Sequence, residues 1–334
     1  MCYMYACSCS CCTASRPSVG KYCVICPLDP VHMPLPDQAL IVKSVYISCC
    51  ATLGCLARLY TDDIRPNSIV LQGSLVSNAI GSFLLGVLKE SDLNEGNLPH
   101  LYTGLTVGFC GGYTTYSGWN LRIVRAALRD TDGPGGGLVA VVSVLLSLAF
   151  YVACFVAGGD LAKTIVDRFT IQRRGTRPAA VSKARAFAAM FTLYGLLILL
   201  LILDTNGGRR SDWIAGMFAP VGALLRFLLS RLLNDRWREG AFPAGTFIAN
   251  VSGSMALGLL YYGVGGSLRT GWDGRVLKGF EGGFLGCLTT MSSFVGEVVG
   301  HREKYEPSAS YWYLTATVVT SLLLVLIVGV ALGG

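Results

Sequence analysis

The sequence predicts an all-α polytopic membrane protein in which two inverted four-helix repeats are joined by a single linker transmembrane helix, making nine transmembrane helices. Three observations support this prediction. The 334-residue chain is 52% hydrophobic with a mean hydropathy of +0.54. Only 14% of its residues are charged, against about 25% in soluble domains. Three motifs of glycine and polar residues occur twice in the same order. Because so few charges cannot cover a soluble fold of this size, we expect neither a cytosolic enzyme nor a nucleic-acid partner.

Apolar stretches of spanning length, roughly 17–25 residues, define the nine expected helices. Four lie in the first half of the chain, at Gln38–Tyr60, Asn67–Leu88, Leu101–Ile123 and Leu138–Gly158. One uncharged stretch stands between the halves, at Phe187–Leu203. Four more follow, at Trp213–Leu233, Phe242–Val264, Val276–Gly300 and Tyr311–Leu332. A block of four helices starts and ends on one side of the membrane, so the single linker helix inverts the second block.

These spans divide the chain into a leader at 1–36, a first repeat at 37–160, a basic loop with the linker helix at 161–204, and a second repeat at 205–334. The leader holds seven of the 13 cysteines. Three interpretations stay open for it: an incomplete zinc site, a lipidated cytoplasmic tail, or a disordered segment. The stretch Asp160–Arg185 holds seven basic and two acidic residues, which favours the cytoplasmic side. We therefore expect a cytoplasmic N-terminus and an extracellular C-terminus.

The internal repeat is carried by three pairs of motifs at matching positions. They are Gly54-x-x-x-Arg58 with Gly222-x-x-x-Arg226, Gly73-Ser74-x-x-x-Asn78-x-x-Gly81-Ser82 with Gly245-Thr246-x-x-x-Asn250-x-x-Gly253-Ser254, and Gly111-x-x-Thr114-Thr115-x-Ser117 with Gly286-x-x-Thr289-Thr290-x-Ser292. Chance can supply one such match in glycine-rich helices, but not three in order. In an inverted pair, broken helices and ion sites lie at mid-depth in the membrane.

Asn78 and Asn250 fall in the middle of their predicted helices, one turn from Ser74 and Thr246. A membrane asparagine is as often a link between helices as a ligand, and both interpretations stay open. Its amide can donate to an anion without adding positive charge.

The two Gly-x-x-Thr-Thr-x-Ser boxes are poor continuous helices, because adjacent β-branched hydroxyl residues after glycine favour a break. Freed backbone carbonyls must find partners inside a membrane. Four such carbonyls, two from each box, would suit a small cation. The alternative is a kinked packing interface.

Aromatic residues follow each box. The first has Tyr116 and Trp119, and the second has Met291 and Phe294 at the same positions. Aromatic residues at this spacing often face lipid, but an aromatic edge carries positive partial charge and can meet an anion. Polar stripes at helical spacing mark the last helix of each block and are functional by default inside a span. They are Tyr313, Thr317 and Ser321 in the second block and Ser143, Ser147 and Tyr151 in the first.

Together these motifs resemble those of the eukaryotic fluoride exporters, which are fused homologues of the bacterial Fluc (CrcB-type) fluoride channels. The resemblance covers the chain from about Gln38 to the C-terminus. It implies a passive, fluoride-selective channel that exports cytoplasmic fluoride across the plasma membrane. It further implies a chain that sits in the lipid bilayer and works as a monomer, since the two halves form a pseudo-dimer.

The resemblance also assigns roles to residues. It implies a structural Na⁺ held by the backbone carbonyls of Gly111, Thr114, Gly286 and Thr289. It implies anion-attracting vestibules at Arg58 and Arg226, with the acidic Glu297 nearby. The pore or fluoride-binding residues that we expect are Asn78, Asn250, Tyr116, Phe294, Thr115, Ser117, Thr290, Ser292, Tyr313, Thr317 and Ser321.

The chain departs from the family, which has phenylalanine at both aromatic positions of each box. Carried over, one pore pairs Tyr116 with Phe294 and the other pairs Met291 with Trp119. A thioether is only a weak acceptor and an indole is bulky, so we expect one working pore, that of Tyr116 and Phe294. Arg122 also replaces the acidic residue that the second block keeps as Glu297.

The competing hypothesis is a small-solute/proton antiporter of the dual-topology type. It requires a membrane carboxylate early in each block, whereas Glu281 and Glu297 both lie late in the second block. An intramembrane enzyme would need a cluster of catalytic groups. The three histidines, His32, His100 and His301, lie outside the repeated motifs, so we expect no enzyme.

Overall fold

The computed structural model describes residues 38–63, 74–91, 98–129, 135–169, 183–204, 208–236, 241–264 and 270–333. Every regular element within these residues is helical. The elements are α1 (Gln38–Asp63), α2 (Ser74–Lys89), α3 (Pro99–Thr103), the π-helical η2 (Gly104–Cys110), α4 (Gly111–Tyr113), α5 (Ser117–Arg129), α6 (Gly135–Phe169), α7 (Lys183–Leu203), α8 (Arg210–Leu233), α9 (Ala244–Gly263), α10 (Gly271–Phe280), the π-helical η6 (Glu281–Leu285), α11 (Gly286–Leu288), α12 (Met291–Lys304) and α13 (Pro307–Leu332).

Seven helical stretches in the described part of the chain are long and apolar enough to cross a membrane, and α2 is apolar but shorter. The chain is therefore a multi-pass membrane protein. One predicted end is corrected: α6 continues past Gly158 to Phe169, so the start of the expected basic loop is helical. The rest of that loop, at 170–182, and the cysteine-rich leader lie outside the described residues.

Side-chain exposure also fits a lipid environment, because large apolar side chains cover the outside while many polar side chains are buried together with the apolar core. Large apolar side chains are exposed on the outer helices, such as Leu138 at 67%, Phe191 at 68% and Ile327 at 61%. The interior instead holds buried serines, threonines, asparagines and two arginines. A polar interior behind an apolar surface is what a membrane path for a polar solute requires.

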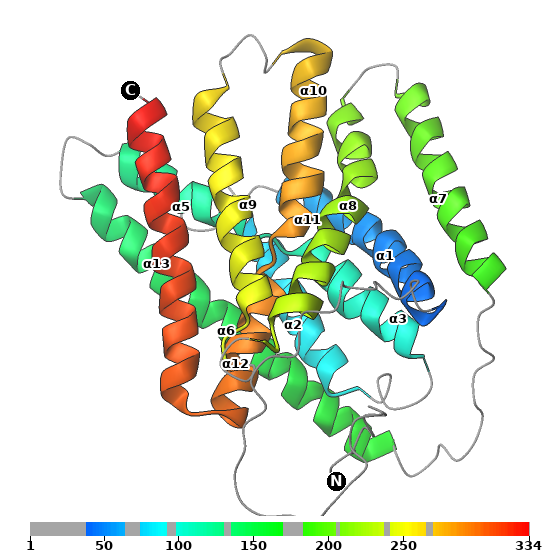
Figure 1. Ribbon diagram of the computed structural model, residues 1–334, viewed down its shortest axis with the longest axis horizontal. Helices are drawn as coiled ribbons and strands as arrows, with labels where there is room; N and C mark the ends of the chain where they lie inside the picture. The colour runs from blue at the N-terminus through cyan, green and yellow to red at the C-terminus, as the bar shows by residue number, and fades with distance from the viewer. Residues whose placement is uncertain are drawn as a thin grey trace, which may run out of the picture. The chain divides into compact units, whose positions relative to one another are not determined.

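Within each half, the same pairs of elements pack together. In the first half α1 packs against η2 and α4, and α2 packs against α6. In the second half α8 packs against η6 and α11, and α9 packs against α13. The predicted duplication therefore extends from sequence motifs to helix packing (Figure 1).

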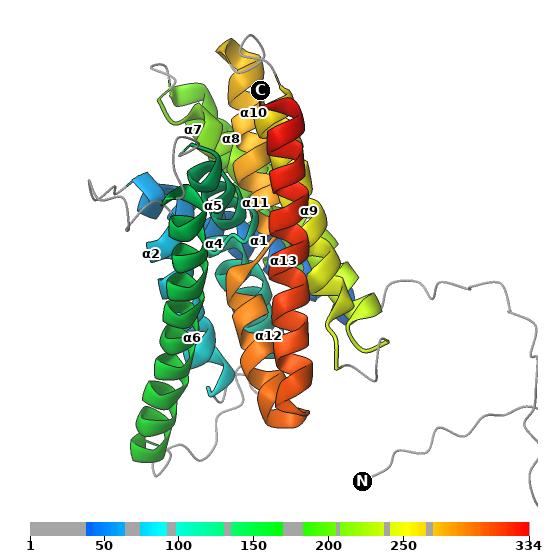
Figure 2. The same cartoon turned by 90° about the vertical axis from the view of Figure 1, so that its left-hand side faces the viewer.

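The two halves interlock through the second part of each broken helix. Helix α5 of the first half packs against α9 and α13 of the second, and α12 packs against α2 and α6. Helices α1 and α8 also contact each other. Figure 2 shows α12 and α13 side by side, with α6 along the neighbouring edge. Helices α6 and α13, which carry the predicted polar stripes, therefore each pack against a half-helix that comes from the other repeat.

Equivalent glycines permit the close approach of helices at the two halves' centres. A Cβ on Gly54 of α1 would collide with the backbone oxygen of Phe109, and one on Gly222 of α8 would collide with that of Phe284. These are the glycines of the two Gly-x-x-x-Arg motifs. Small residues at such crossings let backbones meet where lipid supplies no hydrophobic drive.

Proline 220 interrupts the hydrogen-bond ladder of α8, because it has no N–H to offer Gly216. The hydroxyl of Thr52 on α1 donates to the Gly216 oxygen instead, at 3.1 Å. A side chain of one half therefore satisfies a backbone group of the other, which adds a specific link to the α1–α8 contact.

Candidate functional site

Both predicted interruptions are present in the structure. Thr114 leaves the helix with φ −105° and ψ 153°, and Thr289 does so with φ −97° and ψ 146°. Each break follows a π-helical stretch, η2 or η6, in which backbone carbonyls are displaced from the regular ladder. The half-helices α5 and α12 then start inside the protein, with their positive N-terminal ends buried.

The two motif asparagines clamp these breaks. The Asn78 amide donates to the Thr115 oxygen at 3.1 Å and accepts from the Thr115 N–H at 2.9 Å. Asn250 makes the same two bonds to Thr290, at 3.2 and 2.9 Å. Both side chains are fully buried. Each asparagine thus satisfies extended backbone in its own repeat, and one amide hydrogen of each remains for another acceptor.

The hydroxyl residues of the boxes join the two repeats. Thr289 Oγ1 accepts from the Ser117 N–H at 3.1 Å, and Thr114 Oγ1 accepts from the Ser292 N–H at 3.2 Å. Thr115 Oγ1 lies 3.4 Å from Thr289 Oγ1, and Thr290 Oγ1 lies 3.2 Å from Thr114 Oγ1. The predicted pore hydroxyls Thr115, Ser117, Thr290 and Ser292 therefore form reciprocal links at the crossing of the two broken helices.

Arg58 and Arg226, for which the resemblance implies anion-attracting vestibules, are both buried, at 2% and 3% exposed. Arg58 Nη1 donates to the Gly286 oxygen at 3.0 Å, and its Nη2 donates to that of Gly282. Arg226 donates to the oxygens of Val107 and Cys287, at 2.8 and 3.0 Å. Carbonyls freed at the π-helical turns and breaks draw the guanidinium groups inward, since a buried charge needs hydrogen-bond partners.

These arginines make the centre of the protein electropositive. The salt bridges in the described part of the chain involve other cations, namely Arg122, Lys163 and Arg209. Two buried guanidinium groups bonded to carbonyl oxygens keep most of their charge effective in a medium of low dielectric constant. An anion passing nearby is stabilised by this charge.

Two of the four oxygens that the resemblance assigns to a sodium ion, those of Thr114 and Gly286, share one hydrogen-bond partner. Arg58 Nη1 bridges the Thr114 oxygen of the first half, at 3.4 Å, and the Gly286 oxygen of the second half. A carbonyl oxygen has two lone pairs, so both atoms can accept from the arginine and still face a cation. In the described residues, no cluster of three histidine, cysteine or acidic side chains could hold a metal. Backbone carbonyl oxygens are ligands that suit a hard cation.

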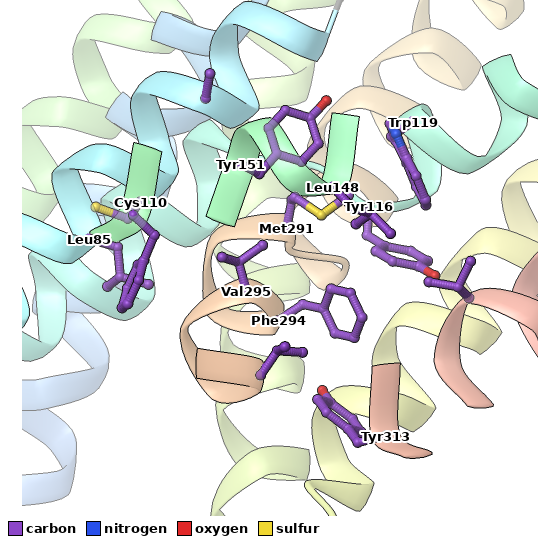
Figure 3. Close-up of a cluster of buried hydrophobic side chains, with 14 of the residues drawn as sticks. Leu85, Cys110, Tyr116, Trp119, Leu148, Tyr151, Met291, Phe294, Val295 and Tyr313 are labelled. Carbon is purple, nitrogen blue, oxygen red and sulfur yellow. The ribbon is translucent and has the colours of Figure 1, made fainter. Parts of the chain in front are cut away.

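One tract of buried side chains runs along α13, and we call it the α13 tract: Tyr116, Phe294, Tyr313, Thr317 and Ser321. The ring centroids of Tyr116 and Phe294 lie 5.4 Å apart, edge to face, and those of Phe294 and Tyr313 lie 5.3 Å apart. Figure 3 shows Phe294 between the two tyrosines. All five residues are fully buried. The structure thus brings together the aromatic pair that the sequence assigned to one pore.

A carboxylate stands at the Tyr313 end of this tract. Glu297 accepts hydrogen bonds from the hydroxyls of Thr246 and Tyr313, both at 2.7 Å, and from the Asn234 amide at 3.2 Å. Asn234 in turn accepts from the Gly245 N–H at the start of α9, at 2.8 Å. Glu297 therefore orients the hydroxyl of Tyr313, which lies at one end of the tract.

The corresponding residues of the other repeat make a second set, the α6 tract: Met291, Trp119, Ser147 and Tyr151. The Trp119 indole N–H donates to the Ser147 hydroxyl at 2.9 Å. Met291 and Tyr151 are fully buried, and Figure 3 shows the methionine sulfur between Tyr151 and Tyr116. Ser143, the third residue of the predicted stripe, is exposed. At the Glu297 position, Arg122 lies 3.8 Å from Asp62, whose other oxygen accepts from Ser77 at 2.9 Å.

Two polar residues of the α13 side were absent from the sequence prediction. Asn120, fully buried, donates to the Ser321 hydroxyl at 2.8 Å, and Asn234 binds Glu297. Asn120 lies one helical turn after Tyr116, and its counterpart in the second repeat is Val295. This difference between the repeats can be read from the sequence. A polar residue inside a predicted membrane helix of one repeat, with an apolar residue at the same position of the other, indicates a role in that repeat alone.

The fold and the site define a class: a multi-pass membrane protein whose two homologous halves enclose buried polar tracts at the crossing of two broken helices. The family description CrcB-like protein, Camphor Resistance (CrcB), matches residues 45–158 and again 213–330. The chain belongs to this family and contains its unit twice.

Fungal and bacterial relatives agree with this assignment. The chain is 31% identical over 254 residues to Fluoride export protein 1 of Candida albicans and 30% identical over 259 residues to that of Neurospora crassa. The matches cover 71% and 68% of this chain but 63% and 47% of those proteins. One half is 36% identical over 110 residues to the Fluoride-specific ion channel FluC of Syntrophotalea carbinolica, covering 32% of this chain and 89% of that protein. No solved structure matches the chain.

Proposed function

We propose that this protein is a passive, fluoride-selective anion channel that exports cytoplasmic fluoride across the plasma membrane through one working pore. The observation that carries the proposal is the α13 tract, in which Tyr116 of one repeat meets Phe294 of the other beside a ladder of buried hydroxyls. The names of the fungal and bacterial relatives support fluoride as the solute. Those relatives are named as transport proteins, and we propose no enzymatic activity.

Selectivity follows from how the tract replaces water. A small anion that holds its hydration shell strongly needs a continuous series of donors, as a cation needs oxygens in a selectivity filter. The hydroxyls of Tyr313, Thr317 and Ser321 can rotate from their present acceptors toward a passing anion. The edges of Tyr116 and Phe294 add positive partial charge between them. The two rings are in direct edge-to-face contact, with centroids 5.4 Å apart, so we propose that the anion passes along their edges and not between them.

Direction needs no coupled reaction. Fluoride enters cells from acidic surroundings as neutral HF and dissociates in the cytoplasm. A membrane potential that is negative inside then drives the anion outward by about 2.3 kcal/mol per 100 mV, which corresponds to about 50-fold in concentration. The buried charges of Arg58 and Arg226 lower the cost of the anion in the membrane centre.

For topology, we propose that each half crosses the membrane four times, with three continuous helices and one broken helix. Helix α7 crosses once more, which gives nine spans and inverts the second half. The matched packing of the two halves supports this arrangement. It puts the N-terminus and the basic loop in the cytoplasm and the C-terminus outside. Residue 175 of that loop lies outside the described residues. A Gly175→Cys variant should resist an impermeant thiol reagent added to intact cells, and labelling above the parent chain's background would overturn the orientation.

We further propose that a structural Na⁺ is held by the carbonyls of Gly111, Thr114, Gly286 and Thr289 when bound. Such an ion supplies positive charge that joins the two breaks. The chain's own residues supply the rest: Asn78 and Asn250 fix the breaks, and the threonine hydroxyls link them. The reciprocal contacts between the halves support a complete site within one chain, so we propose that the protein acts as a monomer in the bilayer.

The test is fluoride efflux from liposomes that contain the purified protein, with chloride efflux as the control. A passive channel releases fluoride without a proton gradient and retains chloride. The antiporter hypothesis predicts release that requires an opposing proton gradient, and it is not supported by the relatives. Fluoride retention in liposomes with correctly folded protein would overturn the proposal.

A further inference from the structure

Three polar groups meet at one point between α5 and α13. Ser321 Oγ lies 2.9 Å from the Tyr116 hydroxyl and 2.8 Å from the Asn120 amide nitrogen. All three residues are fully buried. This cluster, which we call the α5–α13 station, lies at the end of the α13 tract opposite Glu297.

The hydrogen atoms at the station can be assigned from the bonds. The Ser321 hydroxyl donates to the Thr317 oxygen one turn earlier, at 2.8 Å. Its single proton is then in use, so Ser321 Oγ accepts from both the Tyr116 phenol and the Asn120 amide. Two donors of different side chains thus converge on one buried atom. That is the environment an anion requires, and the serine oxygen occupies it here.

A second observation concerns the other end of the Asn120 amide. Asn120 Oδ1 is buried and has no hydrogen-bond partner among the described residues. A buried acceptor without a hydrogen-bond donor raises the free energy of the folded protein. The space beside Asn120 Oδ1 therefore favours a species that carries an O–H or N–H donor. A bare anion brings none, whereas an anion that retains one water molecule does. The amide can then bind both parts, with N–H toward the anion and oxygen toward the water.

The station is confined to one repeat, so the fold does not require it. The residues that correspond to Tyr116 and Asn120 in the second repeat are Met291 and Val295, neither of which can donate. On that side the hydroxyl of Ser147 already accepts from the Trp119 indole. A phenol and an amide at these two positions therefore reflect a local function on the α13 side.

We propose that Tyr116, Asn120 and Ser321 form a binding station for a fluoride ion that keeps one water molecule, and that Asn120 is a ligand that determines selectivity there. The anion takes the N–H and O–H donors that now meet at Ser321 Oγ. Its water donates to Asn120 Oδ1. The inference rests on the proposed function, because it assigns a station along the same pore.

The decisive variants are Asn120→Val, which installs the residue of the other repeat, and Tyr116→Phe, which removes one oxygen atom. Fluoride efflux from liposomes is measured against internal fluoride concentration, with chloride efflux and thermal unfolding of the purified protein alongside. We expect each variant to slow fluoride efflux about 10- to 100-fold and to raise the half-saturating fluoride concentration, because a hydrogen bond to an ion is lost. The matched control is Tyr151→Phe, which removes a phenol from the α6 tract and should leave efflux unchanged.

The outcomes separate the station from the channel itself. If both variants match the parent chain in rate, half-saturation and chloride exclusion, the station is overturned, while the loss of efflux in Phe294→Ile would still support the pore. If the parent chain passes no fluoride, the proposed function fails first. If Asn120→Val does not fold, Tyr116→Phe decides alone, because it retains the ring and its contact with Phe294.

Discussion

In the α13 tract, Tyr116 and Phe294 stand edge to face, and each hydroxyl along the helix has a rotatable proton. In the α6 tract, the same two positions hold Met291 and Trp119, and the indole N–H is fixed on the Ser147 hydroxyl. At one end, Glu297 orients Thr246 and Tyr313, whereas Arg122 faces Asp62 at the equivalent place. Duplicated backbones thus carry unlike side chains.

From this difference we infer which features serve the fold and which serve the proposed conduction. Everything that holds the broken helices together is present twice: the asparagine clamps, the threonine–serine links and the buried arginines. The combination of two aromatic edges with three buried residues that carry hydroxyls on one helix is present once, in the α13 tract. A membrane protein that needs both halves to bury its breaks can lose one of two pores without losing its structure.

The strongest way to break this comparison is to remove the aromatic edge of the α13 tract. Phe294→Ile keeps an apolar side chain of smaller volume but leaves no edge with positive partial charge between the two tyrosines. We expect fluoride efflux from liposomes to be abolished, with a fall of more than about 100-fold. Size-exclusion chromatography checks folding. Efflux at the parent rate in a folded Phe294→Ile protein would show that the pores are assigned the wrong way round.

Much of this architecture could be predicted from the sequence. Hydropathy predicted the seven helical stretches that are long and apolar enough to cross a membrane. The repeated Gly-x-x-Thr-Thr-x-Ser boxes predicted the breaks at Thr114 and Thr289, because glycine and β-branched residues act locally. The hydrogen bonds of Arg58 and Arg226 could not be predicted, because they depend on carbonyls freed by π-helical turns in distant segments. Asn120 was missed for the same reason: its partner, Ser321, lies 201 positions further along the chain.

The next prediction tests whether the clamps are equivalent. Asn78→Ala and Asn250→Ala each remove two hydrogen bonds and leave a buried N–H and a buried carbonyl unsatisfied. We expect both substitutions to lower the free energy of unfolding by a similar amount, about 2–4 kcal/mol. Denaturant titration of the purified proteins measures it. A large loss for one asparagine and none for the other would mean that the halves differ in structure as well as in function.

Sodium removal also tests whether the two halves depend on each other, because an ion bound to carbonyls of both breaks would stabilise both halves together. We expect unfolding in detergent to occur at a lower temperature when Na⁺ is replaced by K⁺. The stabilisation should amount to about 2.7 kcal/mol at a sodium concentration 100 times the Kd. The dependence must saturate with concentration, which distinguishes it from an effect of ionic strength. Equal unfolding temperatures in Na⁺ and K⁺ at every concentration would rule out the ion.

The smallest effect on fluoride efflux is expected for substitutions in the α6 tract, through which we propose that no fluoride passes. Met291 and Trp119 are buried, so Met291→Ala and Trp119→Ala leave cavities and should destabilise the protein by about 2–5 kcal/mol. Efflux of fluoride from liposomes, normalised to folded protein, should nevertheless stay within about twofold of the parent, because a change of 0.4 kcal/mol or less in the barrier corresponds to that ratio. Trp119→Phe is the milder control, since it keeps an aromatic ring while releasing the Ser147 hydroxyl. If Trp119→Phe instead raised efflux, the hydrogen bond between the Trp119 indole and Ser147 would be what closes a second pore. If Met291→Ala abolished efflux in a folded protein, the α6 tract would be the conducting one.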